Sequence, residues 1–218
     1  MSSFPSRTAV VTGASSGIGW ETARLLAERN WTVIVHAPDI ASGQSARDRL
    51  IAAGADASLV HTAVADFARL DAVRSMASAI AAAHPVIDVL VNNAAVAAPE
   101  RHTITEDGNE LSFQVNFLAA YLLTRELTAP LSTRTGSRVI NVSSSMHRTA
   151  SIQWNDLNRT RRYSRLAAYA QSQLALTVFA HSTGAYTELP RVSWSPRSCD
   201  QAVCGVSSSC VQYACSYS

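Results

Sequence analysis

The stretch Thr12-Gly-Ala-Ser-Ser-Gly-Ile-Gly19 directly follows a short apolar run at 9–11. Its three glycines, Gly13, Gly17 and Gly19, carry no Cβ, so the backbone can pass close to a bound group. An amphipathic segment follows, and the order is therefore strand, turn and helix. Because backbone N–H groups at a helix N-terminus attract anions, this stretch predicts a turn that binds the phosphates of a dinucleotide.

Short apolar runs alternate with longer amphipathic segments along the chain. The expected strands are 9–12, 32–35, 59–62, 88–91 and 138–142, with a weaker sixth at 191–194. The expected helices are 21–28, 43–53, 70–83 and 110–127. This alternation predicts an α/β fold of the Rossmann-like doubly wound type, with a parallel sheet covered on both faces. A ligand is then expected where the strand order reverses.

The composition favours one soluble domain. The 218 residues are 47% hydrophobic, enough to bury a sizeable core. The net charge of +2 comes from 18 basic and 16 acidic residues, a balance that does not favour nucleic acid as a partner. The densest basic cluster, 159–165, is interpreted as a solvated face. All the basic residues are arginine, and the chain contains no lysine.

Targeting and metal signals are not found in the sequence. Residues 1–8 lack the pattern of a signal peptide, and no apolar run approaches the roughly 20 residues of a membrane span. We therefore expect a cytoplasmic protein without a membrane span. The four cysteines lie within the last twenty residues at spacings that match no common zinc pattern, so no metal site is expected. They are Cys199, Cys204, Cys210 and Cys215.

Taken together and in order, these motifs resemble the short-chain dehydrogenase/reductase family, over residues 9–180. The turn 12–19 resembles that family's glycine-rich cofactor turn, and 92–95, Asn-Asn-Ala-Ala, resembles its Asn-Asn-Ala-Gly motif with alanine in place of glycine. The segments 105–131 and 142–172 resemble the retinol-dehydrogenase-like branch. Each motif by itself also has a structural interpretation. Asn92 and Asn93 could form a turn, Ser143 to Ser145 could cap a helix, and Tyr169 could be an aromatic residue of the core.

The resemblance implies hydride transfer between a nicotinamide and an alcohol, ketone or aldehyde carbon of a small molecule. Tyr169 would be the acid in reduction or the base in oxidation, and Ser144, rather than Ser143, would hydrogen-bond the substrate oxygen. Asn116 would hold a water or the backbone geometry in the proton relay. The implied cofactor-binding residues are Gly13, Ser15, Ser16, Gly17, Ile18, Gly19, Asp39, Asp66, Asn93, Ala94 and Tyr169.

One departure from the family affects the catalytic site. Where the family has lysine four residues after the tyrosine, this chain has Gln173, on the same helix face. In the family that lysine lowers the tyrosine pKa and hydrogen-bonds the nicotinamide ribose, whereas glutamine offers hydrogen bonds without charge. An unassisted phenol has a pKa of about 10. The sequence therefore predicts weak or absent dehydrogenase activity, with the fold retained.

The choice between NAD and NADP stays open, with NADP slightly favoured by the branch resemblance. In the family an acidic residue at the end of the second strand favours NAD, whereas an arginine there favours NADP. Ala37 and Pro38 occupy these two positions, so neither marker is present. Asp39, twenty residues after Gly19, could still reach a ribose and argues weakly for NAD.

The C-terminus is the second departure. We assign 1–196 to the dinucleotide-binding domain and expect 197–218, rich in serine and cysteine, to be an irregular tail without the family's last edge strand. Arg197 stands where the family has a glycine after Pro196. The tail is either a divergent terminus or out-of-frame sequence after a frameshift, and the abrupt loss of the pattern favours the second.

Two functional classes follow from these observations. One is an impaired oxidoreductase that uses NADP or NAD; the other is an inactive nucleotide-binding or partner-binding relic with the same fold. The resemblance also implies a homodimer or homotetramer formed through the helices at 110–127 and 166–180.

Overall fold

The computed structural model describes residues 7–183, 192–194 and 212–217. Five parallel strands form the body of one sheet in the order β3-β2-β1-β4-β5. They are β1 (Thr8–Val11), β2 (Thr32–Ala37), β3 (Val60–Val64), β4 (Val89–Asn92) and β5 (Arg138–Ser144). The predicted doubly wound α/β fold is thereby confirmed, and the strand order reverses between β1 and β4.

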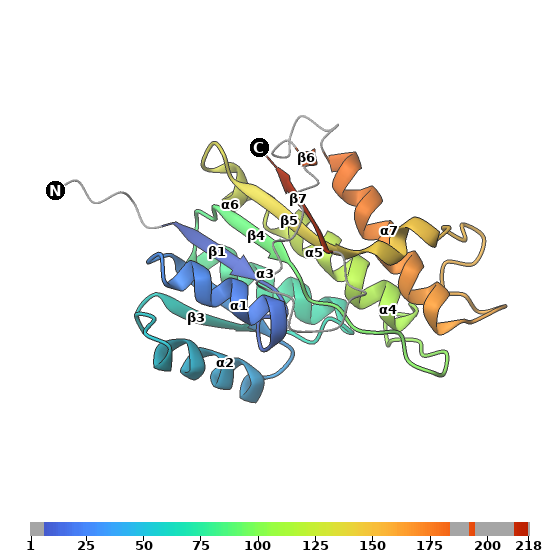
Figure 1. The fold of residues 1–218 in the computed structure, drawn as a ribbon, viewed down its shortest axis with the longest axis horizontal. Helices are drawn as coiled ribbons and strands as arrows, with labels where there is room; N and C mark the ends of the chain where they lie inside the picture. The colour runs from blue at the N-terminus through green and yellow to red at the C-terminus, as the bar shows by residue number, and fades with distance from the viewer. Residues whose placement is uncertain (1–6, 184–191, 195–211, 218) are drawn as a thin grey trace.

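Helices cover both faces of this sheet (Figure 1). The helices α1 (Gly17–Ala27) and α2 (Ile40–Ala52) pack on one face. The other face carries α3 (Leu70–Ala83) and α5 (Ala119–Glu126), with α7 (Arg165–Thr183) beside α5. A short helix α6 (Thr128–Ser132) precedes β5, and a 3-10 turn at Ser145–Thr149 follows it.

Successive strand residues supply two separate cores. Val10 of β1 packs with α3 and α5, whereas Val11, the next residue, packs with α1 and α2. The same alternation holds in β2 and β4, because successive side chains of a strand point to opposite faces. These three strands are therefore largely apolar, as their sequence predicted.

The predicted helix at 110–127 forms over 111–126, but it is not α-helical throughout. The structure divides it into α4 (Leu111–Phe113), a π-helical turn at Gln114–Leu118, and α5. Single π turns inside α-helices are frequent at functional sites. Asn116 lies within the π turn, a position that the site description below explains.

Two antiparallel strands extend the sheet beyond β5. The strand β7 (Gln212–Tyr217) pairs with β5, and β6 (Val192–Trp194) pairs with β7 at the edge. The expected sixth strand therefore forms in the same direction as β5, but the antiparallel β7 lies between the two. The prediction of an irregular tail is wrong at 212–217, which form β7. The open edge of β5 offers unpaired backbone groups to an extended segment that follows it. The parallel part ends at β5, in agreement with the predicted lack of the family's last strand; Arg191, Pro196, Arg197 and the first three cysteines lie outside the described residues.

No helix among the described residues is both long and apolar enough to cross the membrane.

Candidate functional site

The glycine-rich turn is packed so tightly against the segment after β4 that two of its glycines cannot be replaced without movement. A Cβ on Gly13, whose φ is +62°, would lie 2.7 Å from Cα of Ala94. A Cβ on Gly19 would lie 2.4 Å from both the Gly13 carbonyl oxygen and Nδ2 of Asn93. These two glycines therefore hold the turn and the segment after β4 together.

Thr12 joins the same two segments through its hydroxyl. Its Oγ1 accepts hydrogen bonds from the backbone N–H groups of Asn93 and Ala94, both at 2.9 Å, and donates to the Val91 carbonyl at 3.2 Å. The side-chain amide of Asn93 donates to the carbonyl of Thr12 at 2.9 Å and of Gly13 at 3.3 Å. Asn93, a predicted cofactor residue, thus fixes the shape of the turn.

His36 on β2 is a site residue that the sequence did not single out. The Gly13 N–H donates to its Nδ1 at 3.0 Å, so the ring proton is on Nε2 and donates to the Ala65 carbonyl at 2.9 Å. The ring stacks on Phe67 with centroids 4.2 Å apart. Burial lowers the pKa of His36 to about 4, despite the bond to Ala65. A neutral histidine therefore connects the glycine turn to the segment after β3.

We expect this histidine to make the protein acid-sensitive. Because the pKa of His36 is lower in the folded protein than the ordinary 6.5, its contribution to stability is fully present above pH 6.5 and is lost as the pH falls toward 4. The difference corresponds to about 3 kcal/mol. Urea unfolding of the wild type and of His36→Gln between pH 7 and 4 measures it. The free energy of unfolding should fall more steeply in the wild type; parallel curves would contradict the prediction.

A cleft of about 540 Å³ lies at the carboxyl ends of the parallel strands, where the strand order reverses. It brings together segments that follow β1, β2, β3 and β4, far apart in the sequence. Six of the predicted cofactor residues line it: Gly13, Ser15, Ser16, Asp66, Asn93 and Ala94. His36, Pro38 and Phe67 also line it, whereas Gly17, Ile18, Gly19, Asp39 and Tyr169 do not.

The N-terminus of α1 opens beside this cleft without a side-chain cap. Ser16 is the N-cap residue, its side chain makes no capping hydrogen bond, and the first turn carries no acidic residue. A Cβ built on Gly17 would meet nothing within 4 Å. Uncapped N–H groups at a helix start, beside an open space, fit a phosphate.

The two predicted acidic residues have local structural partners. Asp39 is the N-cap of α2 and accepts from the backbone N–H and the hydroxyl of Ser42, both at 2.8 Å. These hydrogen bonds, the backbone one first, lower the pKa of Asp39. Asp66 accepts from the Ala68 N–H at 2.9 Å in the turn after β3. Asp66 lines the cleft and Asp39 caps the neighbouring helix, so a ribose would reach Asp66 more directly.

A second cleft of about 610 Å³ adjoins the first. Tyr169, Arg165 and Leu166 of α7 line one side of it. The segment 95–98 lines the other side, and Ala95 and Val96 line both clefts. Tyr169 is half-buried. The cleft of the tyrosine therefore borders the cleft over the glycine turn along Ala95 and Val96.

Asn116 fixes the wall shared by the two clefts. Its side-chain Oδ1 accepts from the Val96 N–H at 2.8 Å, and its Nδ2 lies 3.1 Å from the Val96 carbonyl and 3.0 Å from Oγ of Ser172. Ser172 Oγ in turn donates to the Tyr169 carbonyl at 2.7 Å. The π turn directs Asn116 to this position. Of the two roles predicted for Asn116, its contacts support the one of holding the backbone geometry.

The two serines at the end of β5 have different partners. Ser143 Oγ lies 3.3 Å from the Gln173 carbonyl and 3.0 Å from Oγ1 of Thr177, so its hydroxyl faces α7. Ser144 Oγ accepts from the Met146 N–H at 3.3 Å and caps the turn that follows. This hydrogen bond joins Ser144 to the turn rather than to α7, but Ser144 is only 8% exposed and lines neither cleft, so its role as the substrate-binding serine stays a prediction.

Gln173 is 1% exposed and lies one helical turn after Tyr169 on α7. Its carbonyl accepts from Oγ1 of Thr177 at 2.9 Å as well as from Ser143. The residue at the family's lysine position is therefore neutral and buried within the protein.

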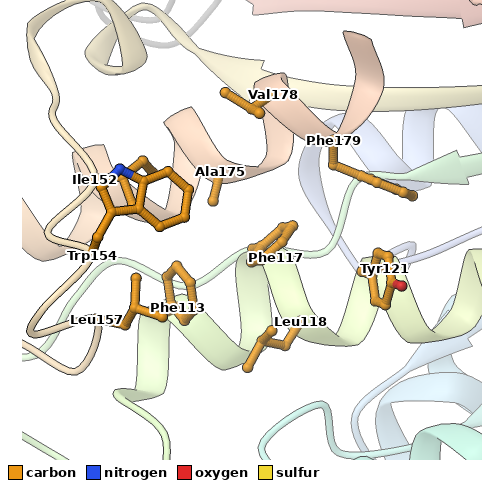
Figure 2. A pocket seen from close by; sticks show the side chains of 10 residues that line it. All are labelled: Phe113, Phe117, Leu118, Tyr121, Ile152, Trp154, Leu157, Ala175, Val178 and Phe179. Atoms are coloured by element: carbon orange, nitrogen blue, oxygen red, sulfur yellow. The ribbon is translucent and has the colours of Figure 1, made fainter. Parts of the chain in front are cut away.

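An apolar groove of about 310 Å³ lies apart from both clefts, between the helical segment 111–126 and α7 (Figure 2). Its lining includes Phe113, Phe117, Tyr121 and Leu118 on the first, and Ala175, Val178 and Phe179 on the second, with Ile152, Trp154 and Leu157 from the loop before α7. Trp154 is 77% exposed and Val178 49%. The groove therefore leaves apolar side chains of two helical segments open to solvent.

Among the residues that the structure describes, no three or more His, Cys, Asp or Glu side chains gather in a group that could hold a metal ion.

Comparisons with known proteins agree with this geometry. A family model described as short chain dehydrogenase matches residues 7–186. Retinol dehydrogenase 13 of Homo sapiens is 38% identical over 180 residues, which cover 81% of this chain and 53% of that protein. Polyprenol dehydrogenase of Mus musculus is 41% identical over 181 residues, with the same coverage. The chain spans about half the length of these curated relatives.

Solved structures extend the comparison. An uncharacterized protein from Mycobacterium paratuberculosis superposes with a TM-score of 0.73 at 36% identity, over 84% of this chain and 63% of that one. A metagenomic short-chain oxidoreductase in complex with NADP gives a TM-score of 0.61 at 29% identity, over 82% of this chain and 75% of that one.

Proposed function

The chain belongs to the short-chain dehydrogenase family, and on this premise we propose that it is an NAD(P)-dependent oxidoreductase acting on the alcohol or carbonyl group of a small molecule. The observation that carries the proposal is the wall formed by Ala95 and Val96, which lines both the cleft over the glycine turn and the cleft of Tyr169. A nicotinamide bound along the first cleft would thus meet a substrate in the second. NADP is the favoured cofactor.

The residues of the first cleft fit a dinucleotide. The uncapped start of α1 offers N–H groups to the pyrophosphate, and the close packing at Gly13 and Gly19 fixes the turn that presents them. The nicotinamide would supply or accept the hydride. The protein would bind and orient the two reactants and move one proton.

Tyr169 would move that proton. In reduction its hydroxyl donates to the oxygen of the substrate carbonyl, and in oxidation its phenolate accepts the alcohol proton. Ser144 would donate a hydrogen bond to the same oxygen. Asn116 would hold Val96 and Ser172 in place, and with them the wall beside the substrate. Because Gln173 brings no positive charge to the phenol, the rate would be low.

Gln173 also favours a second function. A chain that keeps the phosphate turn and lacks every lysine could bind nucleotide without turnover, as an inactive relic or a partner-binding protein. Titration of NADPH and NADH by fluorescence, followed by a turnover assay on a panel of aldehydes and ketones, separates the two. Binding with turnover that Tyr169→Phe abolishes supports the enzyme, and binding without turnover supports the relic. Binding of neither nicotinamide would overturn the enzyme and the nucleotide-binding relic, and would leave the partner-binding protein.

We propose further that a second copy of the chain covers the apolar groove and forms a homodimer, with a homotetramer as the alternative. The groove is lined by both helical segments for which the family resemblance implies dimerisation. Tyr121→Arg should therefore shift the protein to a monomer in sedimentation at micromolar concentration. Ile40→Arg is the matched control, an exposed apolar residue on α2 away from the groove. An unchanged sedimentation coefficient for Tyr121→Arg would contradict the dimer. Cytoplasmic localisation and the lack of nucleic acid binding stay predictions.

A further inference from the structure

We propose that Arg49 recognises the 2′-phosphate of NADP, in place of the arginine that the family carries at the end of β2. The inference rests on the proposed function, since it assumes that the cleft binds a nicotinamide dinucleotide. It assigns the cofactor preference to α2, because β2 ends in Ala37 and Pro38, which offer a phosphate no charge.

The guanidinium of Arg49 is held at the glycine-rich turn. It lies 4.5 Å from the ring centroid of Trp20, and its Nη1 donates to the Ser15 carbonyl at 3.1 Å. The indole N–H of Trp20 donates to the Ala46 carbonyl at 3.4 Å, which fastens the ring to α2. A guanidinium stacked on an aromatic face keeps its edge available for further hydrogen bonds. Arg49 is therefore positioned beside Ser15, which lines the cleft.

The cleft itself offers no positive charge. Of the residues that line it, only Asp66 is ionised, because burial keeps His36 neutral. A 2′-phosphate, which carries up to two negative charges, would have to be met by a cation at the rim. Arg49 is exposed, and none of the ion pairs formed by the described residues includes it. Its remaining N–H groups can pair with phosphate in the bidentate geometry that guanidinium favours.

Two neighbouring charged groups already have other partners. Asp39 occupies the N-terminus of α2 through its two hydrogen bonds to Ser42, so the phosphate cannot use that helix start. Arg47, two residues before Arg49, directs its guanidinium to the carbonyls of Ala57 and Val60 at 2.9 and 3.0 Å. Arg47 therefore serves as a matched control on the same helix.

The test compares two nucleotides that differ only by the 2′-phosphate, adenosine 2′,5′-bisphosphate and adenosine 5′-monophosphate, by isothermal titration calorimetry. The wild type should bind the bisphosphate about tenfold or more tightly, as expected for a charge-assisted hydrogen bond. Arg49→Gln should bind both nucleotides equally, with unchanged affinity for the monophosphate. Arg49→Lys should keep part of the preference, and Arg47→Gln should keep all of it.

The outcomes separate the inference from the proposed function. If the wild type binds both nucleotides with the same affinity, or if Arg49→Gln keeps the preference, the inference is wrong while nucleotide binding stands. If the wild type binds neither nucleotide nor a nicotinamide, the proposed function is wrong and the inference falls with it. Thermal unfolding of each variant shows that the fold is intact, since Arg49 lies on the surface.

Discussion

If the chain is the proposed oxidoreductase, replacing Gln173 with lysine is expected to raise the rate of alcohol oxidation by about a hundredfold. The side chain at this position lies one helical turn from Tyr169 and is 1% exposed, so a charge there acts through the protein interior rather than through water. A lysine that lowers the tyrosine pKa by about two units favours the phenolate by about 3 kcal/mol at neutral pH. The phenolate is the form that accepts the alcohol proton, so the gain is expected in kcat.

The measurement is kcat with a saturating nicotinamide between pH 6 and 10. The wild-type rate should rise toward pH 10, and the Gln173→Lys rate should reach its plateau at lower pH. Gln173→Met is the matched control, similar in length and uncharged, and should show no gain. Tyr169→Phe added to the lysine variant should remove the gain, because no proton acceptor remains. A fast wild type that lysine leaves unchanged would show that Gln173 does not impair the enzyme.

Replacing Gly19 with alanine abolishes nucleotide binding and lowers the free energy of unfolding by more than about 3 kcal/mol. Its Cβ would lie 2.4 Å from a backbone carbonyl oxygen and from the Asn93 amide, so the turn and the segment after β4 must separate. Overpacking in a filled core commonly costs about 1–3 kcal/mol, and backbone atoms yield less readily than side chains. Displacement of the turn would also move the N–H groups at the start of α1 away from the position of the pyrophosphate.

Urea unfolding and NADPH titration measure the two effects. Gly43→Ala is the control, because its Cβ would find ordinary contacts at 3.6 Å and lies within a helix, where alanine is the better residue. That variant should be stabilised by up to about 1 kcal/mol and bind nucleotide normally. Retained NADPH binding by Gly19→Ala would mean that the turn is not the phosphate site.

Some site residues could not be identified from the sequence, because their roles depend on contacts with distant segments. Hydrophobic periodicity does not identify the partners of His36, which lies in an otherwise apolar strand and resembles a core residue in the sequence. A signal was present, however: a polar ring in a buried strand must find hydrogen-bond partners. Those partners, Gly13 and Ala65, are 23 and 29 residues away, and only the folded sheet brings them together. The contact of Arg49 with Ser15, across 34 residues, was hidden for the same reason.

The helical segment 111–126 is a second case in which hydrophobic periodicity did not predict the backbone geometry. Its apolar spacing predicted a continuous helix, yet the backbone opens into a π turn at Gln114–Leu118. The hydrogen bonds of Asn116 to Val96 and Ser172 accompany this turn, and both partners lie on other elements. A choice between α and π geometry that depends on distant partners leaves no trace in local sequence.

The sequence by itself determined the five parallel strands, the glycine turn and the glutamine at the family's lysine position, because strand hydrophobicity, glycine geometry and residue identity are local properties. The tertiary structure decided what these residues contact: that Thr12 and His36 fasten the turn, that Asp39 caps a helix, and that Tyr169 shares a wall with the dinucleotide cleft. Each of these is a polar contact or a shared surface between segments separated in the chain. Their geometry exists only once the strands have paired and the helices have packed on them.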